Sequence, residues 1–250
     1  MYPQIFGVID SYVVMLILGV VACLLLYWFY AKKKNDDVKL RLDFLLVGIV
    51  SIISGIIFAC LFENLYELIQ DPSIYKWTWG MTFYGGLFGG VVAFFLMHFL
   101  YFKKIYGPYL QRVFIIAPAC ITLAHTFGRV GCFLEGCCYG KPTDAWFGIK
   151  FVTTTTKVIP TQLFEAIFLA ILTIIFIFLA FKKDFKYSLV IYCLSYSIFR
   201  FIIEFYRGDP RGGFFLSLSP SQWWCIALFI ISIPLFFVLH NIVYKKKEVI

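Results

Sequence analysis

Runs of apolar residues, each about 20 residues long, alternate with short polar connections along almost the whole chain. A helix of this length crosses a hydrocarbon layer of ~30 Å. The pattern therefore predicts an all-α integral membrane protein, with about seven transmembrane helices in a single polytopic domain over residues 1–250. We place the spans at approximately 11–31, 41–62, 82–102, 112–127, 159–181, 187–206 and 220–243.

Composition agrees with this pattern. Hydrophobic residues make up 62% of the chain and charged residues only 14%, whereas a soluble domain carries about 25% charged residues. The first ten residues contain no Lys or Arg, and the first apolar run is longer than that of a signal peptide. We therefore expect no cleaved signal peptide.

Lysine and arginine are distributed unequally between the two sides of the predicted bundle. Fourteen fall on the side that holds the connections 32–41 and 103–112, the turn 182–186 and the C-terminal tail, and seven fall on the other. The positive-inside rule makes the richer side cytoplasmic, so the N-terminus is outside and the C-terminus inside. The net charge of +8 is then an insertion signal. We expect no nucleic-acid partner, because the basic residues form no stripe.

The longest polar connection joins the fourth and fifth spans on the outer side. We define it as the functional outer loop, residues 128–158; it is Gly-rich at first and then Thr-rich. Long loops in compact proteins are usually functional.

His125 and Arg129 precede and open this loop. If the fourth helix continues, they are spaced i and i+4 and share a face. A guanidinium at a membrane boundary suits a lipid phosphate, because it can bind two oxygens at once. The alternative is that Arg129 extends to the headgroups and His125 packs against a carbonyl.

The sixth span contains charged residues inside an apolar run. Tyr196, Arg200 and Glu204 fall on one helical stripe, and Arg207 follows one turn later. A charge at membrane depth costs several kcal/mol and usually faces a cavity or a partner. Arg200 and Glu204 have two possible roles. They belong to a functional site, or they form a purely structural ion pair of a kind that apolar packing could replace.

Three cysteines, Cys132, Cys137 and Cys138, lie in the outer loop. A disulfide between two of them is the favoured interpretation on an oxidising side of the membrane. A zinc site with His125 as fourth ligand is the less favoured one, and we expect no metal. The remaining cysteines lie in apolar spans and are expected to act as small hydrophobic residues: Cys23, Cys60, Cys120, Cys193 and Cys225.

Several segments together resemble the prolipoprotein diacylglyceryl transferases. Residues 128–133 read GRVGCF, similar to the family signature G-R-x-G-N-F, and residues 160–165 read PTQLFE, similar to P-S/T-Q-L-Y/F-E. Residues 196–207 resemble the helix Y-x-x-x-R-x-x-x-E-x-x-R. Residues 80–86 and 221–223 fit two further segments, Tyr12 matches an early tyrosine, and the order agrees from about residue 12 to 240.

The chain departs from the family pattern at three positions. Tyr84 stands where the family has a histidine, Cys132 where it has an asparagine, and Cys137 about where it has a glutamate. The form GCFLEGCCYG resembles a Cys-rich branch of the family.

The resemblance implies transfer of a diacylglyceryl group from phosphatidylglycerol to the lipobox cysteine of a prolipoprotein. The products are a thioether and glycerol 1-phosphate, and no cofactor is implied. The implied partners are phosphatidylglycerol, the prolipoprotein signal peptide with its lipobox, and membrane lipids. The implied location is the bacterial cytoplasmic membrane, with the active site towards the outer face.

The resemblance also implies residue roles. Arg129 and Arg200 would hold the phosphate, and Glu204 would orient Arg200. His125 is our candidate for the base that the family histidine supplies; Tyr84 is a weaker one, because phenol has a pKa of ~10. The expected substrate-binding residues are Tyr12, Gly128, Gly131, Tyr196, Arg207, Gln162 and Glu165.

Two other functions stay open from the sequence. A diverged paralogue would transfer a glycerolipid group to another acceptor or only bind lipid. A membrane thiol oxidoreductase would use the three loop cysteines as a relay, although the chain has no C-x-x-C motif.

Overall fold

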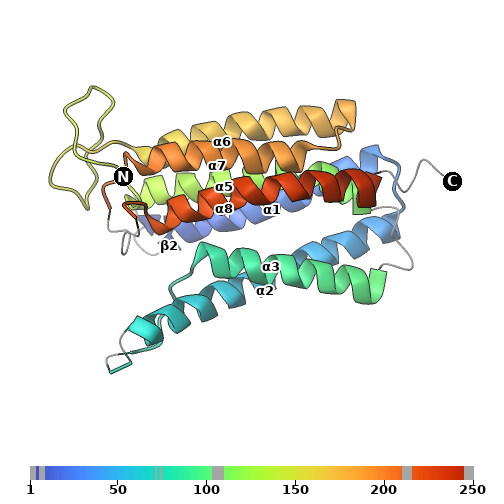
Figure 1. Ribbon diagram of the computed structural model, residues 1–250, viewed down its shortest axis with the longest axis horizontal. Coiled ribbons are helices and arrows are strands. Elements are labelled where there is room, and N and C mark those ends of the chain that lie inside the picture. Colours follow the sequence, from blue (N-terminus) through green and yellow to red (C-terminus); the bar gives the residue numbers. More distant parts are fainter. Residues whose placement is uncertain are drawn as a thin grey trace. The chain divides into compact units, whose positions relative to one another are not determined.

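The computed structural model describes residues 4–5, 9–70, 72–73, 75–102, 110–209 and 216–244, and helices dominate them. The α-helices are α1 (Ser11–Lys33), α2 (Val38–Gln70), α3 (Phe83–Met97), α5 (Leu110–Glu135), α6 (Thr161–Phe178), α7 (Ser188–Glu204) and α8 (Pro220–Val238) (Figure 1). Three of them continue as π-helical turns: η1 (His98–Phe102), η3 (Leu179–Lys183) and η4 (Leu239–Tyr244). Strands β1 (Gln4–Ile5) and β2 (Ile9–Asp10) form a small antiparallel pair. The predicted helical class is confirmed.

The helix surfaces fit a membrane. Among the described residues, five helices are long and apolar enough to cross a bilayer, and a shorter apolar one covers Gly85–Tyr101. On α6, Ile167, Ile171 and Ile174 are exposed, whereas Gln162 and Glu165 are fully buried. An apolar exterior around a polar interior is typical of a helix surrounded by lipid. The chain is therefore a multi-pass membrane protein; the number of crossings and their orientation stay predictions.

The chain forms two compact units, residues 28–109 and residues 1–27 with 110–250. In the unit 28–109, α2 and α3 pack closely through small residues. A Cβ on Gly89 would lie 2.5 Å from the Phe58 side chain, and one on Gly55 would lie 3.0 Å from the Gly86 carbonyl oxygen. Such positions let membrane helices approach each other. Tyr84 lies in the first turn of α3, and its side chain is outside the described part of the structure.

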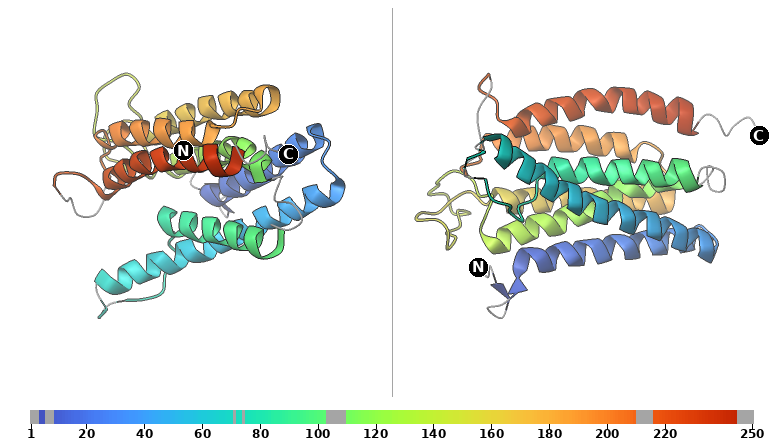
Figure 2. Two further views of the ribbon diagram at one scale, coloured as in Figure 1. Left: turned by 45° about the vertical axis from the view of Figure 1, so that its right-hand side comes forward. Right: turned by 90° about the horizontal axis from the view of Figure 1, so that it is seen from below.

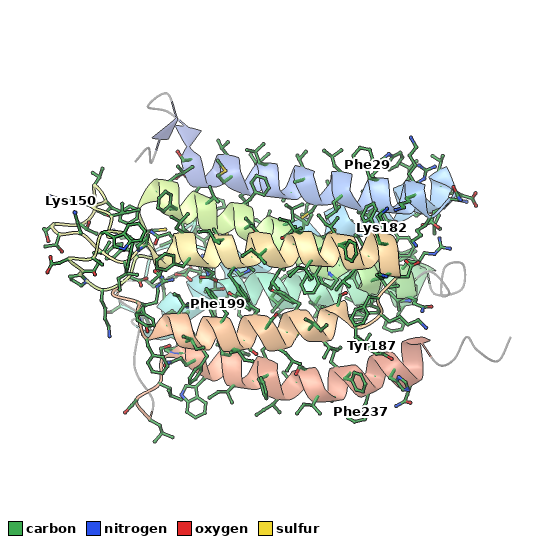
Figure 3. The ribbon with its side chains drawn as sticks, turned by 90° about the horizontal axis from the view of Figure 1, so that it is seen from above. Phe29, Lys150, Lys182, Tyr187, Phe199 and Phe237 are labelled. Atoms are coloured by element: carbon green, nitrogen blue, oxygen red, sulfur yellow. The ribbon has the colours of Figure 1, made fainter. Side chains whose placement is uncertain are left out.

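In the other unit, α5, α6, α7 and α8 run side by side, as both views of Figure 2 show. The connection between α5 and α6 lies at one end of these helices. Lys150 in this connection and Lys182 in η3 lie at opposite ends of the bundle in Figure 3. The expected cytoplasmic lysines at 103–104 and 245–247, and the expected outer Arg211, fall outside the described residues.

The fourth helix is longer than the sequence predicted. The span was expected to end at 127 and the outer loop to begin at 128, but α5 continues to Glu135. It ends where Gly136 adopts a left-handed conformation (φ +79°), and the amides of Gly136 and Cys137 both donate to the Cys132 carbonyl oxygen, at 3.0 and 3.1 Å. A left-handed glycine is a common helix terminator. The connection therefore begins at residue 136.

Candidate active site

Glu165 on α6 is the centre of a buried polar cluster. Its side chain is 0% exposed, in a helix whose outer face is apolar. Its Oε1 atom lies 3.1 Å from Nε of Arg129 and accepts a hydrogen bond from the Tyr196 hydroxyl at 2.9 Å. His125 Nε2 lies 3.6 Å from the same oxygen. Helices α5, α6 and α7 thus each contribute to one site.

The spacing of His125 and Arg129 explains why both reach Glu165. They are separated by one turn of α5, and the helix continues through both, which is the condition for the predicted i, i+4 pairing. The His125 ring packs edge-on against the Tyr196 ring, with centroids 5.1 Å apart. Tyr192, one turn earlier on α7, also stacks on Tyr196, with centroids 5.7 Å apart. Packing therefore fixes the orientation of the imidazole and the phenol.

Arg200 and Glu204 form a second buried ion pair, on α7. Arg200 Nη1 lies 2.6 Å from Glu204 Oε2. The predicted i, i+4 pairing is present in the structure. Arg200 also interacts electrostatically with Glu165. The two ion pairs therefore belong to one charged cluster.

The start of α8 completes the surroundings of this second pair. Ser219 Oγ donates to Glu204 Oε1 at 2.8 Å, and Ser219 Oγ also caps α8 by accepting from the Gln222 amide. The Gln222 side chain accepts from the Ser219 amide in return, which completes a capping box. Arg200 Nη2 lies 3.5 Å from Ser221 Oγ. The first turn of α8 therefore positions both members of the ion pair.

Arg207 lies just beyond α7 and is held by Asp209. Its Nε and Nη2 atoms each donate to one carboxylate oxygen of Asp209, both at 2.8 Å. Its backbone forms a bridge with Gly140 in the α5–α6 connection. The two-point bond fixes the guanidinium plane.

Gln162 lies at the start of α6 and is fully buried. Its side-chain amide donates to the Cys137 carbonyl oxygen at 3.0 Å, and Thr161 donates to the Cys138 carbonyl oxygen at 2.9 Å. Both residues hold the beginning of the connection against α6. The expected substrate-binding role of Gln162 stays a prediction.

Cys132, in the last turn of α5, and Cys137 and Cys138, in the connection, are free thiols, and the expected disulfide is not formed in this structure. Their sulfur atoms all lie within 4.8 Å of one another. Hydrogen bonds from the Cys132 and Cys137 thiols lower the pKa of the Cys138 thiol below its usual value, and the positive charge of Arg207 acts in the same direction. His125, the fourth ligand of the less favoured zinc site, contacts Glu165 instead.

The two candidate glycines have different surroundings. A Cβ on Gly131 would lie 3.0 Å from Cδ2 of Tyr12 and 3.3 Å from Cβ of Met15, so this glycine lets α5 approach α1. The space that a Cβ would occupy is filled by Tyr12, and the expected approach of the Gly131 backbone to a headgroup stays a prediction. A Cβ on Gly128 would meet no described atom within 4 Å, which leaves open space beside Arg129.

Several contacts of the site were not predicted from the sequence. Glu165 was expected in the site without its partner Arg129, although a carboxylate inside an apolar span requires a cation. Ser219 was not expected there; its signal is the sequence Ser-Pro-Ser-Gln, which is typical of a capped helix start. The bond between Arg207 and Asp209 gave no signal beyond their closeness in the chain.

Comparison with known proteins matches this chain to one family. The model of the prolipoprotein diacylglyceryl transferases matches residues 3–238. The chain belongs to this family. It is 33% identical over 254 residues to the phosphatidylglycerol–prolipoprotein diacylglyceryl transferase of Clostridium tetani, covering 98% of both chains. It is 34% identical to the second such enzyme of Clostridium perfringens, covering 91% of this chain and 90% of that one.

A relative from Dehalococcoides mccartyi with the same name is 29% identical over 242 residues. The match to the family model covers nearly the whole chain, including all four helices that supply the buried cluster. The protein is therefore a transferase of lipoprotein biosynthesis, and the thiol oxidoreductase interpretation loses its support.

Proposed function

We propose that this protein transfers the diacylglyceryl group of phosphatidylglycerol to the lipobox cysteine of a prolipoprotein, at the outer face of the bacterial cytoplasmic membrane. The proposal includes seven membrane spans with the N-terminus outside. The observation that carries it is the buried charged cluster of Arg129, Glu165, Arg200 and Glu204 within apolar helices. Such a cluster suits an anionic lipid headgroup that enters from the bilayer.

The reaction needs stabilisation of a phosphate leaving group. A bond forms between the thiol sulfur and a glyceryl carbon, and the bond from that carbon to the phosphate oxygen breaks. The electron pair leaves with glycerol 1-phosphate. Arg129 and Arg200 are the cations suited to this charge, because fixed guanidinium groups in a water-poor site stabilise developing charge without reorganisation. Glu165 and Glu204 position them, at 3.1 and 2.6 Å.

The acceptor thiol must lose its proton before it attacks. We propose that His125 accepts it, because neutral imidazole accepts a proton near pH 7. Its Nε2 atom lies 3.6 Å from Glu165, a carboxylate that can stabilise the imidazolium once it forms. Proton transfer from the thiol to the imidazole balances the charge that leaves with the phosphate.

The acyl chains need an apolar path beside the charged cluster. A groove between α7 and α8, with a volume of about 330 Å³, is lined by Ser197, Ile198, Phe201, Ile202, Cys225, Ile226 and Phe229. The lining residues on α7 flank Arg200 in the chain, and Cys225 on α8 interacts electrostatically with that arginine. We propose that one acyl chain of phosphatidylglycerol occupies this groove while the headgroup lies at Arg200.

A second candidate is transfer of a glycerolipid group to an acceptor other than a lipobox peptide. Tyr84, in place of the family histidine, favours it. The two are separated by measuring glycerol 1-phosphate release from phosphatidylglycerol by purified protein, with a lipobox peptide or with the same peptide carrying Cys→Ser. Release that depends on the lipobox cysteine supports the proposal. Release that is equal with both peptides supports the second candidate.

A further inference from the structure

Cys132, Cys137 and Cys138 form a cluster of three thiols that the transfer reaction does not use. Their sulfur atoms all lie within 4.8 Å of one another. Three thiolates bound at ~2.3 Å to one tetrahedral zinc ion lie about 3.8 Å apart. The thiols therefore need to approach by about 1 Å or less to bind one ion together. We propose that this cluster binds a single thiophilic metal ion, with Zn²⁺ as the best fit.

Glu135, the last residue of α5, lies beside the cluster and would complete the site as the fourth ligand by moving towards the three sulfurs. Its Oε2 atom lies 3.5 Å from Cys137 Sγ and accepts a hydrogen bond from that thiol. Carboxylate oxygen is an ordinary zinc ligand alongside thiolates, and structural zinc sites are usually tetrahedral. A carboxylate beside three sulfurs favours Zn²⁺ over Cu(I), which prefers sulfur alone.

The backbone brings the ligands together before any ion binds. Cys132 is held by α5, and the chain then turns back through two left-handed residues, Gly136 (φ +79°) and Cys138 (φ +63°). The left-handed conformation is uncommon for a residue other than glycine. Thr161 and Gln162 fix the carbonyl groups of the two adjacent cysteines from α6. The turn therefore directs the sulfurs of Cys137 and Cys138 towards Cys132.

The charges around the cluster suit a metal–thiolate centre. One Zn²⁺ with three thiolates carries a net charge of about −1, and a coordinated carboxylate makes it more negative. Arg129 and Arg207 both interact electrostatically with Cys138. These two arginines would offset the negative charge of the centre. A disulfide, in contrast, would use two of the thiols and leave the third unexplained.

Such an ion would connect the end of α5 to the start of α6. Arg129 lies less than one turn before Cys132 on α5, and Glu165 lies one turn after Thr161 on α6. The metal centre would therefore brace the two helices that supply the Arg129–Glu165 pair. The inference does not rest on the proposed reaction, because it concerns binding and stability alone.

The test is zinc binding by the purified full-length protein in detergent, after removal of metal with a chelator under reducing conditions. We expect one Zn²⁺ per chain, with protection of three thiols from alkylation counted by mass spectrometry. Co²⁺ in place of Zn²⁺ should give thiolate-to-metal charge-transfer absorption. Cys138→Ser should weaken binding by at least about tenfold, whereas Cys60→Ser, a cysteine of α2 outside the cluster, should bind as the original chain does.

Three results would overturn the inference. The first is absence of bound zinc in the original protein, with all three thiols freely alkylated at excess Zn²⁺. The second is zinc binding that is unchanged by Cys138→Ser. The third is a disulfide among the three cysteines in protein extracted in the presence of an alkylating reagent. The alkylation count uses the original chain, so it decides the question even if a variant fails to fold.

Discussion

Glu165→Gln removes the charge at the centre of the cluster and keeps the size of the side chain. The ion pair with Arg129 is 3.1 Å long. Two unit charges at that distance interact by about 5 kcal/mol at an effective dielectric constant of ~20. The glutamine oxygen can still accept from Arg129 and Tyr196, so part of this energy is retained. Leaving a buried cation without its counter-charge costs about 3–5 kcal/mol, and we expect the lower end of that range.

We expect the loss to affect catalysis through the position of Arg129. If about 2.7 kcal/mol of the lost interaction energy is lost from the stabilisation of the transition state, kcat/KM falls ~100-fold. Because Glu165 acts through Arg129, the two residues should not contribute independently. In a double-mutant cycle, Glu165→Gln combined with Arg129→Gln should lose little more activity than the worse of the two single variants.

The assay is the initial rate of transfer in mixed micelles, with phosphatidylglycerol varied at a saturating concentration of lipobox peptide. Glu67→Gln on α2 removes one negative charge outside the cluster and is the matched control. Variants are compared after their folding is checked by size-exclusion chromatography and thermal unfolding. Multiplicative losses in the double variant would refute the positioning of Arg129 by Glu165, because independent effects add as free energies.

Three further predictions concern the site and the topology. Arg200→Lys should lose most transfer activity but insert normally into the membrane, because one ammonium group cannot contact both Glu204 and Ser221 as the planar guanidinium does. Unchanged turnover would show that Arg200 has only a structural role. His125→Ala should slow transfer far more than it weakens phosphatidylglycerol binding, and His125→Gln should not restore it; a rate within about threefold of the original excludes the base assignment. A cysteine introduced in the 182–186 turn should react with an impermeant reagent only in permeabilised cells, and labelling of intact cells would reverse the orientation.

The helices could be predicted because their signal is local. Apolar runs mark them directly, and the Arg200–Glu204 pair follows from the i, i+4 spacing within one helix. The end of α5 was misplaced because residues 128–135 contain two glycines and two charged residues, which interrupt the apolar run and resemble the start of a loop. Gly131 is instead required where α5 packs against Tyr12, which only the tertiary structure reveals.

Contacts between helices could not be predicted in the same way. Arg129 and Glu165 lie on different helices, and their pairing depends on how α5 and α6 are rotated against each other. The cysteine cluster depends on two left-handed residues, which the sequence does not specify at Cys138. Burying a charged side chain in a membrane is energetically unfavourable, so the residue types in the site could be predicted from the sequence. The partner of each residue could not.

The most direct test of the proposed function is the mass of a lipobox peptide after incubation with the purified protein and phosphatidylglycerol. We expect an increase equal to the mass of one diacylglyceryl group, added to the cysteine sulfur. The bond should survive treatment that cleaves thioesters, because it is a thioether. An unmodified peptide, in the presence of protein that is folded and binds phosphatidylglycerol, would contradict the account.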